Sequence, residues 1–171
     1  IKRSIYRFGR GRPESEWWMH WTDPTSVVRS PIASQNNERT YWSGEGGLRV
    51  TDATMVASGG GTQYPVVSRP VGVPTPMTPP GATVLGTPAA NATVADRYFV
   101  YTFVNEWGEE GPPSPPSNVA SATSTQQVQL TALDVPSGQW TFSAKRIYMS
   151  NGTGATANFY YLTEIPPGQT T

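Results

Sequence analysis

The second part of the chain alternates short runs of strand-forming residues with turn signals. Residues 97–104 are almost all β-formers and are apolar on both faces, which is typical of a strand enclosed in a sandwich. Residues 127–130 alternate polar and apolar side chains, as a half-buried strand does. Further strands are predicted over residues 118–122, 126–133, 145–150 and 159–164. Because such runs recur about every ten residues, they predict a small antiparallel β-sandwich over residues 93–171.

The first part of the chain predicts a less regular β region over residues 17–64. Its short β-prone runs lie at residues 17–21, 26–29, 40–43 and 48–51. Gly44, Glu45, Gly46 and Gly47 separate the last two runs, and they predict a hairpin with a four-residue loop. The fold class predicted for the whole chain is therefore all-β.

Proline and glycine, 17 residues each among 171, oppose long helices and mark the boundaries between segments. Seven prolines fall between residues 65 and 88, a density that favours extended chain. We therefore expect a proline-rich linker over residues 65–92. The predicted organisation is an extended basic arm (1–16), the irregular β region (17–64), this linker and the sandwich (93–171).

The N-terminal residues 1–12 carry five cationic side chains and no acid. Ile5, Tyr6 and Phe8 interleave with the arginines, so part of the arm could add as a strand to the sheet edge of a neighbouring subunit. The zero net charge of the chain argues against a general nucleic-acid binder. Arginine and aromatic residues are enriched at protein interfaces. The residues predicted to lie at inter-subunit contacts are Arg3, Arg7, Arg10, Arg12, Trp17 and Trp18.

Candidate chemistry is sparse in this sequence. The chain has no cysteine, which excludes disulfides, thiolate metal sites and cysteine nucleophiles. Its one histidine, His20, lies in an aromatic run and is expected to be packed in a strand. Glu109 and Glu110 occupy a turn flanked by glycine and proline, where water should keep both ionised, so a glycosidase-type pair is not expected. We predict no catalytic residue, no metal, no cofactor, no small-molecule substrate and no membrane segment, since no apolar run approaches about 18 residues.

Residues 98–117, from Tyr98 through Asn105-Glu106-Trp107-Gly108 to the proline-serine run, resemble a stretch of tail-associated virion proteins of bacteriophages. There it belongs to a fibronectin type III-like or Ig-like module. Residues 145–150, which contain Arg146-Ile147-Tyr148, and residues 160–166, which end in Glu164-Ile165-Pro166, fit the same pattern. Residues 23–31 and 39–51 are similar to the segment that precedes the module. The resemblance implies a structural subunit of a phage tail, collar or fibre that contacts other copies and neighbouring virion proteins, and it implies no catalytic residues.

The aromatic content leaves a second function open. Nineteen aromatic residues, 11% of the chain, are many for a protein with 14% charged residues. Exposed tryptophan and tyrosine rings stack on sugars or anchor interfaces. The alternative is therefore a carbohydrate- or host-surface-binding module of a phage adhesin or a secreted bacterial enzyme. An exposed coplanar pair among Trp17, Trp42, Trp107 and Trp140 would favour it.

Overall fold

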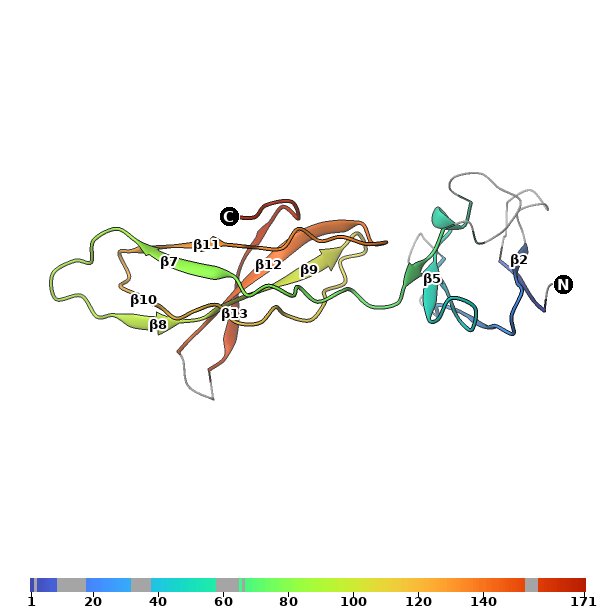
Figure 1. Ribbon diagram of the computed structural model, residues 1–171, viewed down its shortest axis with the longest axis horizontal. Coiled ribbons are helices and arrows are strands. Elements are labelled where there is room, and N and C mark those ends of the chain that lie inside the picture. The colour runs from blue at the N-terminus through green and yellow to red at the C-terminus, as the bar shows by residue number, and fades with distance from the viewer. Residues whose placement is uncertain (2, 9–17, 32–37, 58–64, 66, 153–156) are drawn as a thin grey trace. The chain divides into compact units, whose positions relative to one another are not determined.

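The computed structural model describes residues 1, 3–8, 18–31, 38–57, 65, 67–152 and 157–171 (Figure 1). The chain divides into two compact units, Ile1–Val71 and Gly72–Thr171. Within the described residues, the regular structure consists of β-strands and one 3-10 turn, η2 (Met55–Ala57), without an α-helix. All the strand pairs are antiparallel. The all-β prediction is confirmed.

The described part of the first unit forms a two-stranded and a four-stranded sheet. The smaller sheet pairs β1 (Ser4–Arg7) with β2 (Trp18–Trp21), and the larger has the order β3 (Ser26–Arg29), β4 (Thr40–Ser43), β5 (Arg49–Thr51), β6 (Arg69–Pro70). The predicted hairpin is present, with Trp42 opposite Arg49. Gly44 in its loop has φ 134°, and a Cβ there would lie 2.5 Å from the carbonyl oxygen of Pro24. Only glycine fits that position without a shift of the backbone.

The N-terminal segment differs from the extended arm expected over residues 1–16. β1 pairs with β2 of the same chain, and Tyr6 and Phe8 pack against the core of the first unit. That core is formed by Phe8, Met19, Trp21, Trp42 and Val56. The alternation of apolar and basic residues is a strand pattern, in which every second side chain faces inward. Residues 4–7 thus have a strand partner within their own chain. Residues 9–16 lie outside the described residues.

The described residues of the second unit form seven strands in three sheets. The sheets are β13-β12-β9, β11-β7 and β10-β8. Their strands are β7 (Gly81–Leu85), β8 (Ala95–Arg97), β9 (Phe99–Asn105), β10 (Ala120–Ala122), β11 (Gln127–Thr131), β12 (Phe142–Ser150) and β13 (Phe159–Ile165). Figure 1 shows β9 beside β12. One hydrophobic core joins the sheets, with Phe99, Tyr101, Phe103 and Ile147 packed near Leu133. β9 is buried along its whole length, as its apolar character on both faces predicts.

The segment expected as a linker, residues 65–92, is divided between the two units. β6 belongs to the sheet of the first unit, and β7 pairs with β11, with Val84 opposite Val128. The boundary between the units falls after Val71. Residues 81–85 contain no proline and alternate in burial, so they form a strand although prolines dominate the residues before them.

A proline-rich segment, residues 111–117, covers one edge of β9. The backbone N–H groups of Gly111, Ser114 and Ser117 donate to the carbonyls of Phe103, Tyr101 and Phe99, at 2.8–2.9 Å. The Oγ atoms of Ser114 and Ser117 accept from the N–H groups of Tyr101 and Phe99. The spacing of three matches the three-residue turn of a polyproline helix. Proline cannot donate to a β-ladder, and this segment lies along the edge of the sheet without forming a strand.

Candidate functional site

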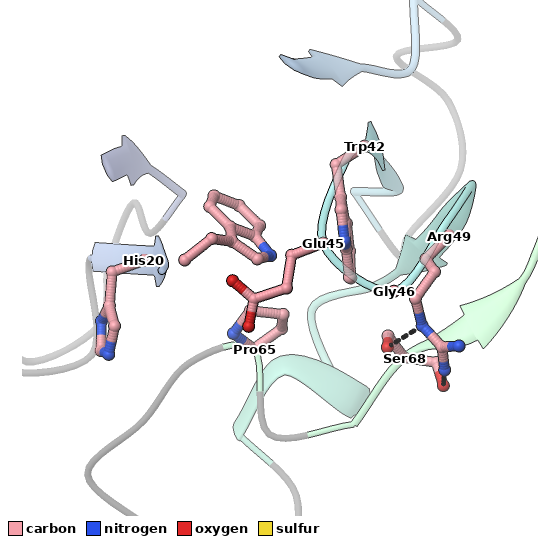
Figure 2. Close-up of a pocket in the computed structure, with 8 residues that line it drawn as sticks. His20, Trp42, Glu45, Gly46, Arg49, Pro65 and Ser68 are labelled. Atoms are coloured by element: carbon pink, nitrogen blue, oxygen red, sulfur yellow. Dashed lines mark hydrogen bonds between the residues drawn. The ribbon is translucent and has the colours of Figure 1, made fainter. Parts of the chain in front are cut away.

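A polar pocket in the first unit contains the one histidine of the chain (Figure 2). Its volume is about 220 Å³. The lining residues are His20, Trp21, Trp42, Glu45, Gly46, Arg49, Pro65 and Ser68. The β2 strand, the β4–β5 hairpin and the residues before β6 bring these side chains together. Figure 2 shows the carboxylate of Glu45 between His20 and Trp42.

The carboxylate of Glu45 holds the hairpin loop against the turn after β2. Its Oε2 accepts hydrogen bonds from the N–H of Thr22 at 2.5 Å, from the hydroxyl of Thr22 at 2.9 Å and from the N–H of Asp23 at 3.1 Å. Three donors converge on one oxygen, so the carboxylate of Glu45 stabilises the contact between the hairpin loop and the turn. The glutamate is positioned by the glycine-rich loop, which brings it over the neighbouring turn.

Replacing Glu45 with alanine should lower the stability of the first unit by about 1–2 kcal/mol, because three donors lose a charged acceptor near solvent. Thermal unfolding followed by tryptophan fluorescence measures this loss. Glu38→Ala is the matched control, since Glu38 forms an exposed ion pair with Arg29, and such pairs contribute little. Equal losses for both variants would contradict a structural role of Glu45.

The other polar groups of the pocket are also fixed by local contacts. Arg49 donates from Nε to the hydroxyl of Ser68 and from Nη2 to the Ser68 carbonyl, both at 2.7 Å. Within the described residues, the imidazole of His20 has no hydrogen-bond partner, and neither has the buried Nε1–H of Trp42. No nucleophile is therefore hydrogen-bonded to a base in the described pocket. The unpaired Nε1–H of Trp42 is buried and has almost no accessible surface, so the pocket does not present it to a ligand.

A second hollow lies on the face of the β9–β12–β13 sheet turned away from the core, and we call it the outer hollow. Its volume is about 330 Å³, and it is lined by Val100, Thr102, Glu110, Gly111, Pro113, Tyr148 and Phe159. Its walls are largely apolar, with one carboxylate. The register pairs Val100 with Tyr148 and Thr102 with Arg146, which places residues from distant parts of the sequence on one face.

Glu110 is the centre of a hydrogen-bond network in the outer hollow. Its Oε1 accepts from the hydroxyls of Thr102 and Tyr148, each at 2.6 Å. Its Oε2 accepts from Nη1 of Arg146 at 2.8 Å, and Nε of Arg146 donates to Glu164 at 3.1 Å. Two carboxylates thus share one guanidinium, which leaves a net charge of about −1 on this face.

The network keeps Glu110 ionised. Burial alone would raise the pKa of Glu110, but the hydrogen bonds from Thr102, Tyr148 and Arg146 outweigh it and lower the pKa below its usual value. Burial and the neighbouring carboxylate raise the pKa of Tyr148 to about 12, so this tyrosine stays a hydrogen-bond donor. A glycosidase acid needs a raised carboxyl pKa, and Glu110 is shifted in the opposite direction. Its ionisation was expected from sequence, but neighbouring side chains are responsible in addition to water.

The structure brings three of the predicted interface residues to the first sheet. Arg7 lies opposite Trp18 and Ile5 lies opposite His20, while Arg3 is exposed just before β1. Ile5 is 65% exposed and Trp18 is 44% exposed. We call these residues, Arg3, Ile5, Arg7 and Trp18, the β1–β2 outer face. Arg10, Arg12 and Trp17 lie outside the described residues.

Strand β13, which the sequence predicts as part of the sandwich, exposes large apolar side chains. Phe159, Tyr160, Tyr161 and Leu162 are between 42% and 56% exposed. Four large apolar residues in succession cannot all face one core, since neighbouring side chains of a strand point to opposite faces. The run of four large apolar residues was the feature of the sequence that could have indicated this exposed surface.

The tryptophans named as possible sugar platforms are arranged for packing. Trp42 and Trp140 are buried, and the Trp107 ring meets Trp140 edge-on at 5.2 Å and 89°. The described members of this set therefore form no exposed coplanar pair, and Trp17 lies outside the described residues. This geometry does not favour the carbohydrate-binding alternative at these rings.

Metal-ligating clusters and membrane-spanning helices are both absent from the described residues. No group of three or more His, Cys, Asp or Glu side chains there could hold a metal ion. Nor does that part of the chain contain a helix of the length and hydropathy required to cross a membrane. Comparison of the chain with family models, curated proteins and solved structures gives no match.

Proposed function

We propose that the protein is a structural subunit of a bacteriophage virion, associated with the tail, a collar or a fibre, and that it acts through contacts between copies. Its second unit is, on this proposal, a fibronectin type III-like or Ig-like module. The resemblance of residues 98–117 and 145–150 to tail-associated proteins supports the proposal. These residues supply β9, its proline-rich edge and much of β12, which are central parts of one unit.

The observation that carries the proposal is the exposed apolar run on β13. Phe159, Tyr160, Tyr161 and Leu162 add little to the core of their own unit. Large apolar side chains exposed on one strand are typical of surfaces that associate with other proteins. The zero net charge of the chain also gives little electrostatic protection against self-association. Burial of β13 between subunits accounts for its composition better than a role in chemistry does.

Sedimentation over a wide range of protein concentration tests the proposal. We expect species that are multiples of the 18.5 kDa chain and that grow with concentration. Mass spectrometry of purified virions, with antibodies against this chain for electron microscopy, should place it in the tail. A chain that stays monomeric at all concentrations and is missing from the particle would contradict the proposal.

A further inference from the structure

The two units carry opposite net charges. Ile1–Val71 contains nine lysines and arginines and six acidic residues, a net charge of +3. Gly72–Thr171 contains three basic and six acidic residues, a net charge of −3. The zero charge of the whole chain conceals this division. Because complementary charge steers association, the first unit of one copy is attracted to the second unit of another.

The basic unit presents an aromatic anchor beside a cation. Trp18 and Arg7 are cross-strand partners on the β1–β2 outer face, with Ile5 next to them on the same strand as Arg7. Trp18 and Ile5 leave about half or more of their surfaces in solvent. Tryptophan and arginine are the residue types that most often dominate the binding energy of an interface. This face therefore has the chemistry of a docking element.

The acidic unit presents a complementary recess. Val100, Pro113, Tyr148 and Phe159 give the outer hollow apolar walls. Glu110 and Glu164 share Arg146, which leaves an excess negative charge beside those walls. At about 330 Å³ the hollow is within the size range of sites that enclose a small ring system. An apolar recess with a negative side fits an aromatic ring that is accompanied by a cation.

From these surfaces we infer that copies of the chain associate head to tail, with Trp18 of one copy seated in the outer hollow of the next. Arg7 then faces the carboxylates Glu110 and Glu164. The inference rests on the proposed function, since it specifies how copies of a structural subunit meet. The contact is heterologous, so in a pair one copy keeps an unused hollow and the other keeps an unused face. Repetition of the contact produces a ring or a filament.

A contact built around one aromatic anchor buries less than the ~1,200 Å² of a standard stable interface. The contact between two copies is therefore weak. Added salt weakens it further, because part of the attraction is between exposed charges. Assembly then depends on repeated contacts and on high local concentration.

Two variants separate the docking element from the recess. Trp18→Glu removes the anchor and places a negative charge beside Arg7, and Phe159→Arg fills the hollow with a positive charge. Each variant alone should raise the dissociation constant by ~30-fold or more, the loss typical of a central interface residue. Mixed together, they should form a one-to-one dimer and nothing larger, because one intact face meets one intact hollow. Sedimentation of the full-length chains measures these species, and circular dichroism checks that both variants fold.

Matched controls place the same charges elsewhere. Val28→Glu in β3 and Val135→Arg in the second unit change residues that are at least as exposed but belong to neither surface. Both should associate as the original chain does. If Trp18→Glu still associates, or if the mixture stays monomeric, the head-to-tail inference is wrong while the proposed function stands. An original chain that is monomeric at every concentration overturns both.

Discussion

Replacing Trp42 with alanine is expected to unfold the first unit and leave the second unit folded. Trp42 is 3% exposed and packs on Trp21 with ring centroids 5.5 Å apart. Met19 and Val56 complete the same core. Removal of a buried tryptophan side chain costs about 3–5 kcal/mol. A unit of this size has a stability near the low end of about 5–15 kcal/mol, so most of it is lost.

Amide NMR spectra of the full chain measure this outcome residue by residue. Signals of residues 1–71 should collapse to unfolded positions, while those of the second unit keep their dispersion. Trp18→Ala is the matched control, because it removes the same type of side chain from a more exposed position in β2 of the same unit. Loss of both units in the Trp42 variant would show that they do not fold independently.

Replacing Tyr101 with phenylalanine should destabilise the second unit and change its response to alkali. The Tyr101 ring is fully buried, its hydroxyl donates to the carbonyl of Thr78 at 3.1 Å and accepts from the N–H of Asp134 at 2.8 Å. Phenylalanine fills the same space but leaves two backbone groups without a partner. The cost is about 1–3 kcal/mol for each such group that stays buried.

The alkaline response follows from the pKa of Tyr101, which burial raises to about 12 from the ordinary 10.0. Below pH 10 the tyrosine is protonated in the folded and the unfolded chain, so its full contribution is present. Between pH 10 and 12 the unfolded chain releases the proton first, and stability falls by about 1.4 kcal/mol per pH unit. The phenylalanine variant lacks this loss, although Tyr148 retains its own.

Denaturant unfolding of both proteins at pH 8 and pH 11 measures the difference in slope. Burial lowers the pKa of Lys145, which changes stability in the opposite direction below pH 10.5, but this effect is common to both proteins and cancels. Tyr160→Phe, a change at an exposed ring, is the control and should follow the original chain. Equal alkaline slopes for the original chain and the Tyr101 variant would contradict the assignment.

Local patterns predicted most of the strands, because strand formation here depends on short runs of suitable residues. The runs at 26–29 and 40–43 became β3 and β4 with the same bounds. β1 was obscured because its arginines suggested a solvated arm, although the alternating Tyr6 and Phe8 face a core. β7 was obscured by the prolines before it. In both cases four or five residues that alternate between inward- and outward-facing side chains form a strand, although the composition of the neighbouring residues favours extended or solvated chain.

The sites were less predictable, because they depend on register between distant segments. Glu110 meets Thr102 nearby in sequence, but Arg146 and Tyr148 reach it only through the pairing of β12 with β9. Glu164 meets Arg146 only through the pairing of β12 with β13. Lys145 gives a sharper case. It is fully buried in β12, and its Nζ donates to the carbonyl of Gln169 at 2.5 Å near the C-terminus. No local pattern distinguishes this lysine from a solvated one.

The proline-rich edge of β9 gives the β9–β12–β13 sheet a direction in which it can grow. Residues 112, 113, 115 and 116 are all proline and carry no N–H, so a foreign strand that approaches from this side finds no ladder of donors. At the opposite edge, β13 contains no proline and its neighbour in the described chain is β12 alone. Templated addition of strands, the route by which β proteins polymerise into amyloid, is therefore blocked on one flank and confined to the other.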